Sequence, residues 1–327
     1  MLLAQCWVGP PRCPSPLHDE GPGQAAMDLW ILQKRPSGAV EPYELMRLRE
    51  EARHLGLRAE AVAPDEIDLI VSRGGSRSIR RCGIEVALPD GLLSRTGSAT
   101  DYFTLAILRQ LEHLGVPVFN SSRSIEAVKD KLYAHQILAQ SNLPIPRTML
   151  VRFPVDIELV SRQIGFPCVV KLLAGSCGEG VLLSRDAGSF RDLMEFIANM
   201  DRSQAVILQQ YISSCPGQDL RVWVIGGRVL GAMLRSSTDG SFKANISRGG
   251  DGQAYPLNPA IEELALQCVN ALHLDMAGVD LLFDNQHYSV CEVNSAADFA
   301  GFEAATGINV ARAVLEHCRA HLPLPLR

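Results

Sequence analysis

The order of the apolar segments changes its character about half-way along the chain. Up to residue 120, apolar runs at 28–32, 67–71 and 116–119 alternate with segments of helical periodicity near 43–55 and 101–114. From residue 166 onward, most apolar runs are separated by short turns, of which Gly226-Gly227 is predicted to be a two-residue hairpin turn. Asn258-Pro259 is predicted to cap and start a helix in this half. The first pattern predicts a parallel sheet with helical crossovers, and the second predicts antiparallel hairpins. The sequence therefore predicts an α/β protein with α+β character in its second half.

Domain boundaries follow from the same patterns. The cluster at 120–124 is rich in helix-capping residues, and the apolar residues behind it recur at helical spacing as far as Leu143-Pro144, which predicts one helix at the junction. We expect an N-terminal domain over 27–120 and a second domain over 121–322, with a central part (121–207) and a C-terminal part (208–322). Residues 1–26 hold five prolines without periodicity, and they are predicted to be either a disordered extension or the product of an upstream start.

Composition excludes several classes of protein. The chain has 327 residues, of which 47% are hydrophobic and 20% charged, and no apolar run reaches the length of a membrane-spanning helix. The net charge of −5 gives no overall basic field for nucleic acid or for an anionic membrane surface. No two of the nine cysteines are spaced C-x-x-C, which disfavours zinc, and their odd number without a signal peptide suggests a reducing, cytoplasmic location.

Two apolar runs near the C-terminus carry a group of oxygen-bearing side chains. Asp280 lies in the run 277–283, and Glu292 and Asn294 lie two residues apart in the run 288–294, so that on a strand both face the same side. A hairpin through 284–287 can place Asp280 opposite them. Two carboxylates and an amide oxygen suit a hard cation such as Mg²⁺. The alternative is a solvated polar face.

A second candidate site lies upstream. The apolar run 166–171 ends in Lys171, and three glycines follow within the segment 175–180. Backbone amides of such a loop bind phosphate oxygens, although many hairpins carry glycine for turn geometry alone. Cys177 lies in this loop and is predicted to be a bystander. Arg73, at the end of the run 67–71, is an anion ligand of a parallel sheet or else a solvated loop residue.

The order of these motifs resembles the ATP-grasp ligases. The resemblance rests on Lys131, Lys171 with its glycine loop, Gln209-Gln210-Tyr211-Ile212, Asp219-Leu220-Arg221, Asp280 and Glu292-Val293-Asn294. Within that superfamily the chain is similar to RimK-type ligases, which add glutamate to a carboxylate, and 306–311 is similar to the segment that closes their catalytic domain. The segments 233–240 and 245–250 are also similar to N-acetylaspartylglutamate and β-citrylglutamate synthases. The resemblance implies an ATP-grasp fold with an N-terminal parallel-sheet pre-ATP-grasp domain.

The resemblance also implies a role for each matching residue. Lys131 and Lys171 would bind the ATP phosphates. A lid with Gly175, Ser176, Gly178 and Gly180 would cover these phosphates. The adenine would meet Gln209, Gln210, Tyr211 and Ile212, the ribose would meet Asp219, and a phosphate or the substrate would meet Lys243. Two Mg²⁺ ions, with Mn²⁺ as an alternative, would bind Asp280, Glu292 and Asn294. The catalytic group would comprise Arg221, Arg235, Asn245 and Arg248.

The implied reaction is an ATP-dependent ligation. A substrate carboxylate attacks the γ-phosphorus of ATP to give an acyl phosphate and ADP, and an amino acid amine, expected to be glutamate, then displaces phosphate to form an amide. The carboxylate belongs to a small acid or to a protein C-terminus, and a homo-oligomer is expected. Residues 295–299, Ser-Ala-Ala-Asp-Phe, depart from the Pro-Gly pattern of RimK, which puts the identity of the acceptor in doubt. The alternatives are a nucleotide-binding regulator on an inactive ligase scaffold and an ATP-grasp phosphotransferase.

Overall fold

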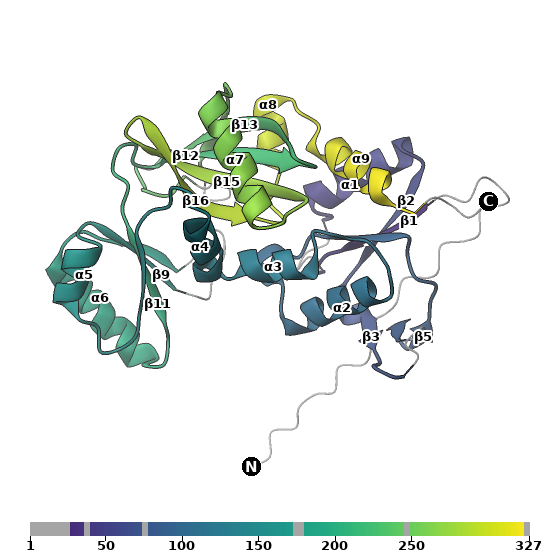
Figure 1. The fold of residues 1–327 in the computed structure, drawn as a ribbon, viewed down its shortest axis with the longest axis horizontal. Helices are drawn as coiled ribbons and strands as arrows, with labels where there is room; N and C mark the ends of the chain where they lie inside the picture. Colours follow the sequence, from purple (N-terminus) through teal and green to yellow (C-terminus); the bar gives the residue numbers. More distant parts are fainter. Residues whose placement is uncertain (1–26, 36–39, 74–77, 173–179, 245–248, 324–327) are drawn as a thin grey trace, which may run out of the picture. The chain divides into compact units, whose positions relative to one another are not determined.

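The computed structural model describes residues 27–35, 40–73, 78–172, 180–244 and 249–323 (Figure 1). The hypothesis about residues 1–26 and the candidate site residues Gly175, Ser176, Gly178, Asn245 and Arg248 lie outside these residues, as does Cys177. Contacts divide the chain into two units, one reaching Ser122 and including residues from Leu315 on, the other spanning 123–314.

The first unit is built on a four-stranded parallel sheet. Its strands are β1 (Met27–Leu32), β2 (Leu57–Val62), β6 (Gly91–Ser94) and β7 (Val118–Phe119), in the order β2-β1-β6-β7. The helices α1 (Tyr43–His54) and α2 (Tyr102–His113) lie where the sequence predicts them, and the unit also contains two short 3₁₀ turns, η1 (Pro64–Glu66) and η2 (Gly97–Ala99). The parallel sheet predicted from the alternation of strand and helix is confirmed.

One strand expected in this sheet lies elsewhere. β3 (Ile67–Leu69) pairs antiparallel with β4 (Ile79–Arg81), which pairs with β5 (Ile84–Glu85) in a separate three-stranded sheet. The edge strand β2 takes its place in the parallel sheet. The sequence of β2 mixes polar and apolar residues, so it does not stand out as an apolar run. Arg73 is therefore not at the carboxyl end of a parallel strand but in an exposed turn, and the argument for it as an anion ligand is wrong.

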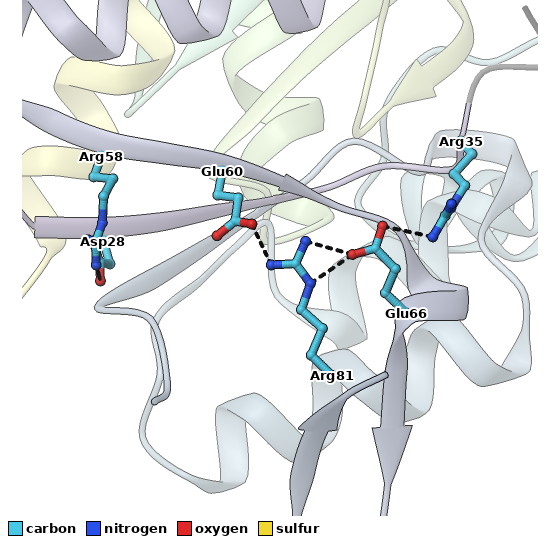
Figure 2. Close-up of polar contacts among 6 residues, drawn as sticks. All are labelled: Asp28, Arg35, Arg58, Glu60, Glu66 and Arg81. Carbon is cyan, nitrogen blue, oxygen red and sulfur yellow. Dashed lines mark hydrogen bonds and ion pairs between the residues drawn. The ribbon is translucent and has the colours of Figure 1, made fainter. Parts of the chain in front are cut away.

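Ion pairs connect the two sheets of this unit (Figure 2). Arg81 of β4 reaches between Glu60 of β2 and Glu66 of η1, and its Nε and Nη2 lie 2.7 and 2.6 Å from Glu66 Oε2. Arg35 Nη2 donates to the other oxygen of Glu66 at 3.1 Å. Burial opposes the charge of Arg81, but the two glutamates outweigh it and raise its pKa. The network fastens the small sheet to the edge of the parallel one.

The second unit opens with two helices where one was expected. α3 (Ser122–Lys129) ends before Asp130, and α4 (Lys131–Gln140) begins directly after it. The Asp130 carboxylate accepts hydrogen bonds from the backbone N–H groups of Leu132 and Tyr133, both at 3.0 Å, so it acts as the N-cap of a new helix. Helical periodicity continues across the break, which explains why the apolar pattern alone does not reveal it.

A four-stranded antiparallel sheet follows. It has the order β10-β9-β11-β8 and consists of β8 (Thr148–Val151), β9 (Cys168–Leu172), β10 (Val181–Ser184) and β11 (Val206–Gln210). The hairpin predicted around the glycine loop is confirmed, since Val181 pairs with Lys171. The helices α5 (Ile157–Gln163) and α6 (Ala187–Met200) cover one face of this sheet (Figure 1).

A five-stranded antiparallel sheet carries most of the candidate site. Its strands are β12 (Gln218–Ile225), β13 (Arg228–Ser236), β14 (Asp251–Tyr255), β15 (Met276–Asp284) and β16 (His287–Asn294), in the order β14-β13-β12-β15-β16. The predicted Gly226-Gly227 turn joins β12 to β13, and both glycines have positive φ. Asn258 caps α7 (Pro259–Ala271) as predicted, and α8 (Ala300–Thr306) and α9 (Val310–His321) follow the sheet.

The two faces of this sheet differ in chemistry. Leu220, Val222, Val279 and Val290 point to one face and form a core with Ile261, Leu264 and Cys268 of α7. Because strand residues alternate between faces, the charged residues of β12 and β15 point to the other side. That face forms the candidate site.

Two further predictions bear on the setting of the protein. Across the residues that the structure describes, no helix is long and apolar enough to cross a membrane. Five of the described cysteines are free thiols: Cys168, Cys215, Cys268, Cys291 and Cys318.

Candidate functional site

The polar face of the five-stranded sheet holds a network of two arginines and two aspartates. Arg221 of β12 forms a bidentate pair with Asp280 of β15, its register partner, with Nη2 2.8 Å from Oδ2. Arg235 of β13 binds both oxygens of Asp219 at 2.6 and 2.7 Å, and its Nη2 also lies 3.0 Å from Asp280 Oδ2. Four of the predicted site residues therefore form one buried charge cluster.

Burial and charge act in opposite directions on these groups. Burial disfavours the ionised form of Asp280, but Arg221 and Arg235 outweigh that effect and hold its pKa below the usual value. Burial also acts on Asp219, and there it prevails over Arg235 and raises the pKa. The carboxylates in turn raise the pKa of Arg235 although it is buried. The cluster thus keeps Asp280 ionised in a site from which water is largely excluded.

A β-bulge brings the other two predicted metal ligands to this face. Leu281 pairs with Val290, but Asp280 pairs with Glu292, so Cys291 is skipped in the ladder. Asn294 follows on the same side, with its Nδ2 3.4 Å from Asp280 Oδ2. Had the regular register continued, Asp280 would face Cys291, and Glu292 would point into the core beside Val279. The bulge is therefore the reason that Asp280, Glu292 and Asn294 share one face.

A glycine opposite Asn294 leaves room for the cluster. A Cβ on Gly278 would lie 2.6 Å from the Ala297 Cβ and 2.9 Å from the Arg221 Cδ. Both distances are shorter than van der Waals contact, so the stem of Arg221 and the segment after Asn294 approach each other only because residue 278 has no side chain. The segment 295–299, which departs from the RimK pattern, thus packs directly on the site face.

A pocket beside this face gathers the two predicted phosphate-binding lysines. Lys131 comes from the first turn of α4, Lys171 from β9 and Glu292 from β16, so three elements converge on it. The pocket is lined by these three residues and by Val128, Ala134, His135, Leu138, Cys291 and Val293. Lysine and glutamate are residue types that suit a polyphosphate bound together with a divalent cation.

His135 forms the inner wall of this pocket. It lies one turn beyond Lys131 on α4, is buried, and its Nε2 lies 3.1 Å from the carbonyl oxygen of Cys291. Its Nδ1 lies 3.3 Å from the hydroxyl of Thr148, which also accepts a hydrogen bond from Gln209 Nε2 at 3.2 Å. Burial, together with the positive charge of Lys171, lowers the pKa of His135 to about 4, so the imidazole is neutral at pH 7.

The predicted adenine segment lies at the end of β11. Gln209 is buried within the ladder, Gln210 is the last strand residue, and Tyr211 and Ile212 follow it. The backbone N–H of Gln210 donates to the carbonyl of Arg147 at 2.8 Å. The ring of Tyr211 contacts that of Phe242 edge to face, at 6.3 Å between centroids.

Two predicted site residues, Lys243 and Gly180, lie next to segments that the structure does not describe. The Nζ of Lys243 lies 5.6 Å from the centre of the Phe242 ring, so the ammonium stacks on an aromatic face. Gly180 has φ +67° and its carbonyl accepts from the N–H of Leu172 at 2.9 Å, which closes the base of the glycine loop. Both residues are therefore placed, although the parts of the loops beyond them are not described.

The residues present fit a divalent cation of the hard type. Among the described residues, no three His, Cys, Asp or Glu side chains cluster as a metal site. The predicted ligand set is smaller, since it has two carboxylates and one amide oxygen from the protein. Mg²⁺ commonly binds in this way, with phosphate oxygens and water completing the coordination. Among the described residues, Oδ2 of Asp280 meets donors from Arg221, Arg235 and Asn294, whereas Oδ1 accepts from Arg221 Nε.

Comparison with known proteins decides the family. A model described as the RimK-like ATP-grasp domain matches residues 128–318, and one described as the RimK PreATP-grasp domain matches residues 27–125. The chain belongs to the RimK-like ATP-grasp family. This confirms the predicted fold class and the predicted class of enzyme, an ATP-dependent carboxylate–amine ligase.

Individual relatives of this RimK-like protein agree with that assignment. It is 34% identical over 290 residues to a probable alpha-L-glutamate ligase 1 of Shewanella amazonensis, covering 88% of this chain and 94% of the relative. It is 33% identical over 284 residues to a probable alpha-L-glutamate ligase of Rhodopirellula baltica, covering 86% of this chain and 69% of the relative. The fold is similar to that of the ATP-grasp ligase PsnB in complex with a precursor variant, Mg and ADP, with a TM-score of 0.69, 20% identity and coverage of 90% and 98%.

The sequence reasoning missed His135, Thr148 and Gly278. A buried histidine four residues after Lys131 was a possible signal, because this spacing places both side chains on one side of a helix. The importance of Gly278 had no such signal, because it depends on the position of Ala297, nineteen residues further along the chain.

Proposed function

We propose that this RimK-like protein joins the amino group of glutamate to a substrate carboxylate at the expense of ATP. The observation that carries the proposal is the convergence of Lys131, Lys171 and Glu292 on one pocket of the ATP-grasp unit. Glutamate enters from the relatives, whose names are probable alpha-L-glutamate ligases. These names apply to those proteins, and their extension to this chain is a proposal.

The nucleotide would be held by the residues of this pocket and of the β11 segment. Lys131 and Lys171 provide positive charge for the phosphates, and the loop with Gly175, Ser176, Gly178 and Gly180 would cover them. The backbone at 209–212 would meet the adenine, and Asp219 the ribose. Lys243 would contact a phosphate or the substrate.

Asp280, Glu292 and Asn294 would hold Mg²⁺, which a solved ligase of similar fold contains together with ADP. When bound, the cation neutralises charge on the phosphate oxygens. We propose two ions, with Mn²⁺ as a substitute. The role of the protein is to keep Asp280 ionised between Arg221 and Arg235 and to direct Glu292 to the same face.

The proposed reaction has two steps. A substrate carboxylate attacks the γ-phosphorus, the bond to the β-phosphate oxygen breaks, and an acyl phosphate and ADP form. The amine of glutamate then attacks the acyl carbon, loses a proton and displaces phosphate, which leaves an amide. Arg221, Arg235, Arg248 and Asn245 would position the transferred group and the carboxylates, because such transfers depend chiefly on positioning and charge stabilisation.

The acceptor would lie against the segment 295–299. Ala297 and Phe299 are buried, and Phe299 packs edge to face on Trp223 at 6.2 Å between ring centroids. A small acid or the C-terminus of a peptide would present the carboxylate. The homo-oligomer and the cytoplasmic location stay predictions.

The experiment that tests this function measures ADP release for a matrix of carboxylates and amino acids, with mass spectrometry of the products. We expect ADP release that requires both a carboxylate and an amine, and hydroxylamine should yield a hydroxamate from the acyl phosphate. A phosphorylated product without an amide would instead indicate a phosphotransferase. Nucleotide binding without turnover on any pair would indicate a regulator.

A further inference from the structure

The bulge at Cys291 lies at the outer edge of the five-stranded sheet. β16 is the last strand in the sheet order, so one side of its backbone has no neighbouring strand. On that side the N–H of Val290 donates to the carbonyl of Pro144 at 2.7 Å, and the carbonyl of Cys291 meets His135 Nε2 at 3.1 Å. The helix α4 and the segment after it therefore take the place of a neighbouring strand at the bulge.

The chemistry of the contact determines which nitrogen carries the proton. A carbonyl oxygen only accepts hydrogen bonds, so Nε2 must be the donor and the neutral ring carries its proton there. Nδ1 then faces the hydroxyl of Thr148, which is linked to Gln209 of β11. The Thr148 hydroxyl has one proton, which can go to Nδ1 or to the carbonyl of Pro146 at 2.9 Å, so the ring lies between α4, β8 and β16 and its contact with Cys291 is the one that fixes it.

We infer that His135 is a positioning residue: its Nε2–H fixes the carbonyl of Cys291 and thereby holds the bulge that directs Glu292 to the face of Asp280. Without a donor at this point, the partly buried carbonyl of Cys291 would lose its partner, and the bulged strand would be free to relax toward the regular register. In that register Glu292 would point to the core beside Val279. The inference deepens the proposed function and rests on it for its second readout only.

Matched variants separate the donor from the volume of the ring. His135→Gln keeps an N–H that can reach the carbonyl, whereas His135→Leu fills similar space without a donor. His113→Leu, at the exposed end of α2, serves as a control. All are made in the full-length chain, and the melting temperature of each is recorded.

The first readout does not depend on catalysis. In the wild type, ¹⁵N spectra should show the Nε2–H tautomer of His135. In His135→Leu the carbonyl ¹³C resonance of Cys291 and the amide resonance of Glu292 should shift, and in His135→Gln they should stay close to the wild type. A Nδ1–H tautomer, or unchanged resonances in His135→Leu, would overturn the inference.

The second readout is binding of ADP by calorimetry, with Mg²⁺ and with EDTA. His135→Leu should weaken binding in Mg²⁺ by about tenfold, the usual effect of removing a residue that orients a metal ligand, and should change binding in EDTA less. His135→Gln should recover most of the loss. If both variants lose the same affinity for ADP, and the loss parallels the fall in their melting temperatures, His135 has only a packing role and the inference is overturned. If the wild type binds no ADP in Mg²⁺, the proposed function fails, and the resonances alone decide the inference.

Discussion

Glu292 lies directly opposite Asp280 because Cys291 is left out of the pairing between β15 and β16. One extra residue in β16 turns Glu292 and Asn294 away from the core and toward the arginines of β12 and β13. The carboxylate pair of the candidate metal site therefore depends on a local irregularity of the strand. It also depends on whatever holds that irregularity in place.

Removal of the Glu292 carboxylate should abolish turnover. We expect Glu292→Ala to lower ADP release at least about 100-fold, because no other described carboxylate faces Asp280 across the ladder. Glu262→Gln, on the exposed side of α7, is the control and should keep wild-type turnover. Retained turnover in Glu292→Ala would remove this residue from the metal site.

The buried pair of Arg235 and Asp219 should be sensitive to loss of one partner. Arg235→Met leaves Asp219 without its bidentate partner, and we expect the free energy of unfolding in urea to fall by about 3–5 kcal/mol. The exposed pair of Arg162 with Glu158, at 3.5 Å, offers a matched comparison in which Arg162→Met should cost less than about 1 kcal/mol. Similar losses in both variants would contradict the assignment of a buried charge cluster.

An added methyl group at residue 278 should disturb the site. Gly278→Ala places a Cβ 2.6 Å from that of Ala297 and 2.9 Å from Cδ of Arg221, and we expect a loss of stability of about 1–3 kcal/mol. The double variant Gly278→Ala with Ala297→Gly relieves the first clash but not the second, so it should recover part of the loss in urea unfolding. Full stability of the single variant would show that the close approach is absent.

The N-cap of α2 should give the stability of the protein a defined dependence on pH. The backbone N–H of Thr104 donates to Asp101 at 2.8 Å, and with a side-chain hydrogen bond from Thr104 and the charge of Lys34 it lowers the pKa of Asp101 to about 2. Since the folded-state pKa lies below the unfolded one, this stabilisation is complete above about pH 4 and disappears as the pH falls toward 2.

The test of this cap compares Asp101→Ala with the wild type in thermal unfolding. We expect Asp101→Ala to cost about 1 kcal/mol at pH 7, with the difference from wild type shrinking between pH 4 and pH 2. Asp192→Ala, at an exposed position within α6, is the control, and its difference in stability from the wild type should not shrink between pH 4 and pH 2. A difference that stays constant with pH would contradict the role of the ionised cap.

The sequence alone was sufficient for many of the elements and for the order of the motifs. The alternation of strand and helix predicted the parallel sheet, the two glycines at 226–227 predicted the hairpin, and Asp280 with Glu292 and Asn294 predicted one polar group, because each depends on residues near in the chain. The break between α3 and α4 and the true place of β3 were mispredicted, because apolar periodicity does not show where a cap interrupts a helix or which strand a segment will join.

Only the tertiary structure decided which face each polar residue takes and what holds it there. The regular register of the 284–287 turn would have sent Glu292 to the core, and the bulge that reverses this is bonded to His135, more than 150 residues earlier in the chain. Likewise, the space for Arg221 depends on Gly278 lying under Ala297. Such contacts join residues far apart in sequence, and their geometry arises only when the strands and helices pack.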